Sequence, residues 1–180
     1  DYGNMTFKDG TSMAEYGCGP AVAAMAINNM SGGASSIANA TASIANNYKD
    51  ANGTQADYFQ DVFGRVGANT EYIDGSGSKK EIENNLGSGN QVVLMGNDSS
   101  NKSKNNSPFG PSNHYVLATG MDGNKIQIND PEQSAPRVYN KDKILNNTQL
   151  GVAVSGGNAG FRNMMSRSKL GKSVSRYSGG

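Results

Sequence analysis

The sequence has very few of the residues that cross-link small proteins or bind metals in them. Its 180 residues include one cysteine, one histidine and no tryptophan. A single cysteine cannot form an internal disulfide bond, and one cysteine with one histidine is too few for a closed zinc site of the usual kind. We therefore expect a fold held together by its apolar core, with no metal and no cofactor.

Long apolar runs and a strong net charge are also absent. No run approaches the roughly 20 apolar residues that cross a bilayer, so we expect no membrane span in this chain. The formal net charge is +1, which does not favour nucleic acid as the main partner. The chain starts at Asp1 without an initiator methionine, as an excised piece of a longer polypeptide would. Its location stays open, with a bacterial or phage cytoplasmic origin favoured.

Apolar residues nevertheless recur in periodic blocks, which predict one folded domain over residues 1–156. The first part of the chain is helical in pattern, with apolar residues on one stripe of each helix. A hairpin is expected over 114–131, with its turn at Asp122-Gly123. Helices are expected at 20–30, 35–48, 54–66, 79–86 and 141–146. Further strands are expected at 69–73, 91–96, 138–139 and 151–156.

The order of these elements, helices first and antiparallel strands after them, predicts the α+β class. The polar segment 97–113 is expected to be a long surface loop. Residues 157–180 are basic, contain no acidic residue and end in Gly179-Gly180, so they are interpreted as an appended tail.

The only cysteine lies in the segment EYGCGPAVAAMAINNM, between two glycines and just before a predicted helix. The positive end of a helix and a nearby imidazole both lower the pKa of a thiol. Cys18 is therefore a candidate nucleophile, and His114, at the start of a predicted strand, is the only candidate imidazole. Asp130 ends the next strand and would hold the His114 ring in the required tautomer. Asn113 and Asn129 are the alternatives for that role.

Each of these residues also has a purely structural interpretation. A lone cysteine beside a helix is often a small buried side chain. A lone histidine at a strand end is often an ordinary hydrogen-bonded residue, and Asp-Pro after a strand is often only a turn. From the residues alone, both interpretations stay open.

Two motifs resemble those of the papain-like double-glycine peptidases, which remove leader segments from bacteriocins. YGCGPAVAAMAINNM is similar to the nucleophile motif of that family, and HYVLATGMDGNKIQINDP to its second motif. The 16 residues from His114 to Asp130 are the spacing that the family uses. The resemblance implies a papain-like cysteine endopeptidase with N-terminal helices packed on an antiparallel sheet. It also implies the catalytic set Cys18, His114 and Asp130, and peptide or protein substrates that are cut after Gly-Gly.

One position departs from the family pattern. The family places a glutamine six residues before the nucleophile to help form the oxyanion hole, and this chain has Ser12 there. The hydroxyl of Ser12 and the backbone N–H of Cys18 are the expected donors. Losing one such donor costs about 10²–10³ in rate. A catalytically weak relative that binds leader-like helices therefore stays open, as does a cell-wall peptide hydrolase.

The tail itself resembles the leaders that the family cuts. Its apolar residues recur at helical spacing before the final glycines. The tail is therefore a candidate for a built-in leader, and the chain end a candidate product of self-release from a longer precursor. The alternative is a flexible basic tail. The residues concerned are Leu170, Val174, Tyr177, Gly179 and Gly180.

Overall fold

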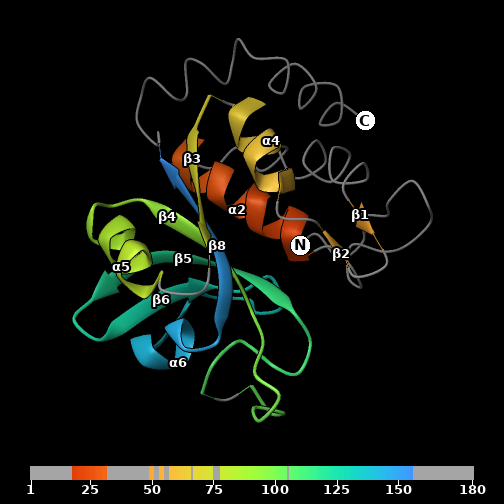
Figure 1. Cartoon of the computed structure of the whole chain (residues 1–180), viewed down its shortest axis with the longest axis vertical. Helices are drawn as coiled ribbons and strands as arrows, with labels where there is room; N and C mark the ends of the chain where they lie inside the picture. The colour runs from red at the N-terminus through yellow and green to blue at the C-terminus, as the bar shows by residue number, and fades with distance from the viewer. Residues whose placement is uncertain are drawn as a thin grey trace. The chain divides into compact units, whose positions relative to one another are not determined.

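The computed structural model describes residues 18–31, 49–50, 53–54, 57–65, 67–74, 78–104 and 106–155 (Figure 1). They fall into two compact units. One is Glu71–Val154, and the other holds the described residues up to Thr70 together with Ser155. The predicted helix at 35–48 and the tail at 157–180 lie outside the described residues, so these elements and the domain boundary stay predictions.

The first unit contains helices α2 (Cys18–Ser31) and α4 (Asp57–Arg65), with a short antiparallel pair between them, β1 (Lys49–Asp50) and β2 (Gly53–Thr54). Helix α2 begins two residues before the predicted start at Pro20. Proline is tolerated there because the amides of the first turn have no carbonyl partner within the helix. The side chains of α2 from Ala21 to Ala24 are all buried, so this turn of the helix is covered on every side, whereas Asn29 near the end of α2 is exposed.

Helix α4 is shorter than the predicted 54–66. Its start moves to Asp57 because Gly53 and Thr54 pair with β1 instead of entering the helix. The side chains predicted to face inward are all buried, which confirms the helical stripe. They are Tyr58, Phe59, Val62 and Phe63.

The second unit is built on a six-stranded sheet with the order β3-β8-β4-β5-β6-β7. The β4–β8, β4–β5, β5–β6 and β6–β7 pairs are antiparallel. The α+β class is thus confirmed, and every strand predicted after residue 68 is present. The strands are β3 (Asn69–Asp74), β4 (Gln91–Gly96), β5 (His114–Asp122), β6 (Lys125–Asn129), β7 (Arg137–Asn140) and β8 (Thr148–Ser155).

Two helices share an apolar core with one face of this sheet. Helix α5 (Lys79–Gly87) lies against β4 and β5, and α6 (Lys141–Leu145) lies beside β6 and β7 (Figure 1). An ion pair of 2.6 Å between Lys141 Nζ and Glu83 Oε1 connects the two helices and raises the pKa of Lys141. The core side chains include Ile82 and Leu86 of α5, Ile144 and Leu145 of α6, and Val92, Leu94, Val116, Ala118, Ile126 and Ile128 of the sheet.

The turn of the predicted hairpin lies one residue later than expected. Asp122 pairs with Lys125, so the two turn residues are Gly123 and Asn124. Gly123 has a φ of +59°, and glycine at the first position of such a turn accepts this left-handed backbone without a steric penalty. The position of the turn is therefore set by Gly123, the residue that tolerates this backbone conformation.

The segment 97–113 is a loop as predicted, but it does not lie wholly on the surface. Ser107–Gly110 are buried, and the ring of Phe109 is fully enclosed in the core. The ring lies against Gly96 at the end of β4. A Cβ atom on Gly96 would be 2.9 Å from the ring and would also meet the carbonyl oxygen of Asn147. Glycine is required at this position because a ring and a carbonyl group approach the backbone there.

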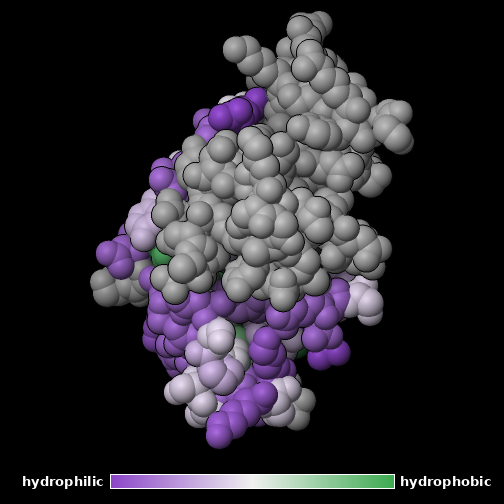
Figure 2. All heavy atoms as spheres, turned by 90° about the vertical axis from the view of Figure 1, so that its right-hand side faces the viewer, coloured by the Kyte–Doolittle hydropathy of each residue, from purple (hydrophilic) through white to green (hydrophobic). Residues whose placement is uncertain are grey.

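Polar side chains cover most of the described surface in Figure 2, where the coloured area is largely purple. Tyr72 on β3 and Val138 on β7 are the large hydrophobic side chains exposed among the described residues. Within the same residues, no helix is both long and apolar enough to span a membrane.

We predict that Gly96→Ala lowers the free energy of unfolding by about 1–3 kcal/mol, because the added methyl group overpacks the site. Gly87→Ala is the matched control, since a Cβ atom at Gly87 meets nothing within 4 Å. It should change stability by no more than about 1 kcal/mol, in the stabilising direction. Urea denaturation of the three proteins measures both effects, and equal midpoints for Gly96→Ala and the wild type would contradict the packing argument.

Candidate active site

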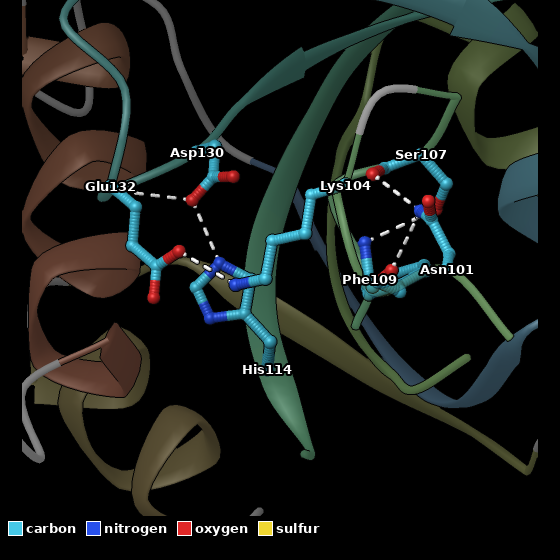
Figure 3. Close-up of polar contacts among 7 residues, drawn as sticks. All are labelled: Asn101, Lys104, Ser107, Phe109, His114, Asp130 and Glu132. Atoms are coloured by element: carbon cyan, nitrogen blue, oxygen red, sulfur yellow. Dashed lines mark hydrogen bonds and ion pairs between the residues drawn. The ribbon is translucent and has the colours of Figure 1, made fainter. Parts of the chain in front are cut away.

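The structure brings His114 and Asp130 together as a buried polar pair (Figure 3). His114 is the first residue of β5, and Asp130 directly follows β6. The His114 Nε2 and Asp130 Oδ1 atoms are 2.7 Å apart, and the two residues are 5% and 4% exposed. This is the proximity that the hairpin predicts. Because Nε2 faces the carboxylate, the neutral ring carries its proton there, and Nδ1 is the nitrogen that can accept another.

A β-bulge in β5 puts the two side chains on the same face of the sheet. Near the turn Gly120 pairs with Gln127, but beyond Thr119 the register changes, and Ala118 pairs with Ile128. Since side chains alternate along a strand, one extra residue moves every later side chain to the other face relative to its partner strand. Without Thr119 as the extra residue, Asp130 and His114 would point to opposite faces.

The Asp130 carboxylate is also held by its own turn. Asp130 Oδ1 accepts a second hydrogen bond from the backbone N–H of Glu132 at 3.0 Å. The N–H of Gln133 donates to the Asp130 carbonyl oxygen at 2.9 Å, which closes the turn. This side-chain-to-backbone bond is the usual way in which an aspartate starts a turn. The orientation of the carboxylate is therefore set locally as well as by the histidine.

An ion pair connects the loop 97–113 to the turn that follows Asp130. Lys104 Nζ lies 2.8 Å from Glu132 Oε2. Asn101 donates from Nδ2 to the carbonyl oxygens of Ser107 and Phe109, at 3.0 and 2.9 Å. The loop is thus internally hydrogen-bonded and tied to the residue two positions after Asp130.

The structure places the side chains of the two alternatives, Asn113 and Asn129, differently from that of Asp130. The side-chain oxygen of Asn113 accepts a hydrogen bond from Asn97 Nδ2 at 2.6 Å. Asn129 is paired with Leu117 in the sheet, so its side chain alternates to the face opposite that of Asp130. Of the three candidates, Asp130 is therefore the one with a contact to the His114 ring that the structure describes.

Cys18 is the first residue of α2, as expected for a thiol at a helix N-terminus. It belongs to the other unit, so its pairing with His114 stays a prediction. Ser12 and the tail residues Leu170, Val174, Tyr177, Gly179 and Gly180 lie outside the described residues.

His114, Asp130 and Glu132 also lie close enough to share a metal ion, with their donor atoms within 4.8 Å of one another. These donor atoms already take part in other polar contacts. Nε2 of His114 meets Asp130, and the Glu132 carboxylate meets the ammonium group of Lys104. We therefore assign no metal to these residues.

Comparison with known proteins identifies the family. The family model described as a peptidase C39-like family matches residues 4–150. The chain belongs to the peptidase C39-like family. This membership confirms the resemblance inferred from the two motifs around Cys18 and His114.

Two solved structures are similar to this member of the C39-like family. One is the peptidase domain of Streptococcus mutans ComA in complex with a small-molecule inhibitor, with 18% identity, 59% of this chain and 79% of that chain covered, and a TM-score of 0.43. The other is the peptidase domain of Streptococcus ComA, a bifunctional ABC transporter of a quorum-sensing pathway, with 17% identity, 77% and 90% coverage, and a TM-score of 0.46. A comparison with curated protein sequences gives no match.

We predict that Asp130→Asn weakens the hydrogen bond on His114 Nε2, because a charged acceptor makes a stronger bond than a neutral one. His114 is the only histidine, so its ring N–H signal in a proton–nitrogen NMR spectrum needs no assignment. That signal should move upfield and exchange faster with water. Asp98→Asn makes the same chemical change in the nearby loop and should leave the signal in place. An identical signal in Asp130→Asn and the wild type would contradict the pairing.

Proposed function

We propose that this protein is a cysteine endopeptidase with Cys18 as nucleophile, His114 as general base and acid, and Asp130 as the orienting group. The observation that carries the proposal is the buried 2.7 Å contact between His114 Nε2 and Asp130 Oδ1. It occurs in a chain of a peptidase family whose only cysteine starts a helix. A carboxylate on one ring nitrogen leaves the chemistry of the thiol to the other, Nδ1.

The reaction is acyl transfer in two steps. The Cys18 sulfur attacks the carbonyl carbon of the scissile bond, and its proton passes to His114 Nδ1. The same nitrogen then protonates the leaving amine, and a thioester remains on Cys18. Water, deprotonated by His114, hydrolyses the thioester and releases the acyl product and the free thiol. Asp130 stabilises the imidazolium ion formed in both steps.

The position of Cys18 at the start of α2 supports two further parts of the mechanism. The positive end of the helix dipole favours the thiolate form of the sulfur. The first four amides of a helix also have no carbonyl partner within it. We therefore assign the backbone N–H of Cys18 as one oxyanion donor and the hydroxyl of Ser12 as the second.

We further propose cleavage after Gly-Gly, with the protein's own precursor as one substrate. Glycines pass through a cleft that would exclude residues with a Cβ atom. The C-terminal segment ends in Gly179-Gly180, and its apolar stripe is suited to docking as a helix in a groove. Ser12 in place of the family's glutamine favours a second candidate, a weakly active relative that binds such helices without cutting them.

We predict that Cys18 reacts with iodoacetamide near neutral pH faster than a free cysteine, because a neighbouring imidazole keeps it ionised. The rate should fall in His114→Ala and be unchanged in Lys80→Ala, a substitution on the exposed face of α5. Intact-protein mass spectrometry follows the reaction directly, since Cys18 is the only cysteine. Equal rates in the wild type and His114→Ala would remove the Cys18–His114 pair.

We predict that a precursor extended beyond Gly180 is cut after that residue when Cys18 is present. Cys18→Ala should stay whole, Gly179→Ala should block release, and Val174→Asp should slow it by weakening docking. Mass spectrometry of the products locates the cut. Cleavage of the Cys18→Ala precursor would assign it to another protease, and binding of the tail without any cleavage would favour the second candidate.

A further inference from the structure

An ion pair links the loop 97–113 to the turn that carries Asp130. Figure 3 shows the ammonium group of Lys104 facing the carboxylate of Glu132. The Lys104 Nζ and Glu132 Oε2 atoms are 2.8 Å apart, and the two side chains are 34% and 52% exposed. Glu132 is also the residue whose backbone N–H donates to Asp130 Oδ1. One residue thus contacts both the loop and the carboxylate that holds His114.

Lys104 is held in an uncommon backbone conformation. Its φ is +56°, the one positive value at a non-glycine position among the described residues. A lysine there costs more than a glycine or an asparagine would. Such outliers persist where the surrounding structure fixes them. Here the surrounding structure is the hydrogen-bonded loop around Asn101.

The loop connects Lys104 to the core. Asn101 bonds both carbonyl oxygens that flank Pro108, and Phe109 is buried against Gly96. The stem of Lys104 crosses Gly110 so closely that a Cβ atom on this glycine would be 2.9 Å from Lys104 Cε. The ammonium group is therefore presented to Glu132 from a loop anchored in the core.

We propose that Lys104 and Glu132 are positioning residues for the His114–Asp130 pair. The ion pair fixes the Glu132 backbone, and the Glu132 amide fixes the carboxylate that orients the imidazole. The catalytic consequence rests on the peptidase function proposed above, whereas the effect on His114 does not. Both residues act through Asp130, because Glu132 binds the carboxylate with its backbone amide and Lys104 with its ammonium group binds Glu132.

Because the ion pair is partly exposed to solvent, its effect on the position of Asp130 can be distinguished from its effect on stability. Half-exposed ion pairs contribute little to stability and are screened by salt. Catalysis, in contrast, is sensitive to small displacements of an orienting group. Removing the ion pair should therefore change the exchange of the His114 ring proton and the reaction rate, while the unfolding midpoint stays nearly unchanged.

Four variants of the full chain test the proposal. Lys104→Met removes the charge but keeps the stem over Gly110, and Glu132→Gln removes the other charge. Lys104→Arg keeps the charge and is the conservative variant expected to restore the contact. Lys102→Met is the matched control, because Lys102 is exposed on the same loop.

The first measurement is the ring N–H signal of the single histidine in the protein without substrate. Exchange of this proton with water should be faster in Lys104→Met and Glu132→Gln, and as in the wild type in Lys104→Arg and Lys102→Met. Raising the salt concentration should bring the wild type toward Lys104→Met and leave Lys104→Met itself unchanged. Identical exchange in all five proteins would overturn the proposal, as would a change that Lys102→Met shares.

The second measurement is cleavage of a Gly-Gly peptide. We expect kcat to fall about twofold to fivefold in Lys104→Met and Glu132→Gln, with KM unchanged. A rise in KM alone would overturn the proposal by making the ion pair a substrate contact. If the histidine signal responds as expected but no protein cleaves the peptide, the proposed peptidase function fails and the positioning of His114 stands.

Discussion

One additional residue in β5 determines whether His114 and Asp130 can meet. The hairpin closes at Asp122–Lys125, and a regular ladder from that turn would set Asp130 opposite Leu117. The bulge at Thr119 shifts the ladder by one residue and sets Asp130 on the face of His114. Everything else that surrounds the pair, from the Asp130 turn to the ion pair beyond it, depends on this register.

Packing in the core also helps to hold the His114–Asp130 pair in place. Gly96 admits the ring of Phe109, and the buried ring anchors the loop 97–113. The loop in turn presents Lys104 to the turn after Asp130. A polar site at the end of a sheet is thereby connected to side-chain packing, which has few alternative arrangements. The connection gives a physical reason why a polar surface loop contains one fully buried phenylalanine.

The sequence predicted the elements whose patterns are local. The apolar run Gln91–Gly96 is bounded by a polar segment on each side and matches β4 residue for residue. The start of α4 was wrong because the pairing of Gly53 with Asp50 is a contact between segments, which a helical stripe does not contain. The turn was displaced by one residue because Asp-Gly and Gly-Asn are both good turn sequences.

Of the candidate site, the sequence predicted the partners but not what holds them. His114 and Asp130 could be found because each stands at the end of a predicted strand. The bulge was not predicted, although the sequence contains a signal for it in the alternation of side chains along the two strands. An unbulged hairpin with its turn at Gly123-Asn124 sends these two side chains to opposite faces. Nothing in the sequence marks Lys104 or Glu132, because their contact joins two loops and both residues are half-exposed.

The pair also has a structural consequence that bears on how variants of it behave. A buried carboxylate is stable only when its lone pairs are satisfied, and Asp130 Oδ1 receives one bond from His114 and one from the Glu132 amide. Removing the imidazole leaves the carboxylate buried with half of those bonds, which destabilises a fold more than the pair stabilises it. Under the proposed function, replacing His114 would therefore both remove the proton acceptor and disturb the turn. Asp130→Asn removes the charge and turns one oxygen into an NH2 donor, but it keeps an oxygen that can accept both hydrogen bonds, so it should disturb the turn less than loss of the imidazole does.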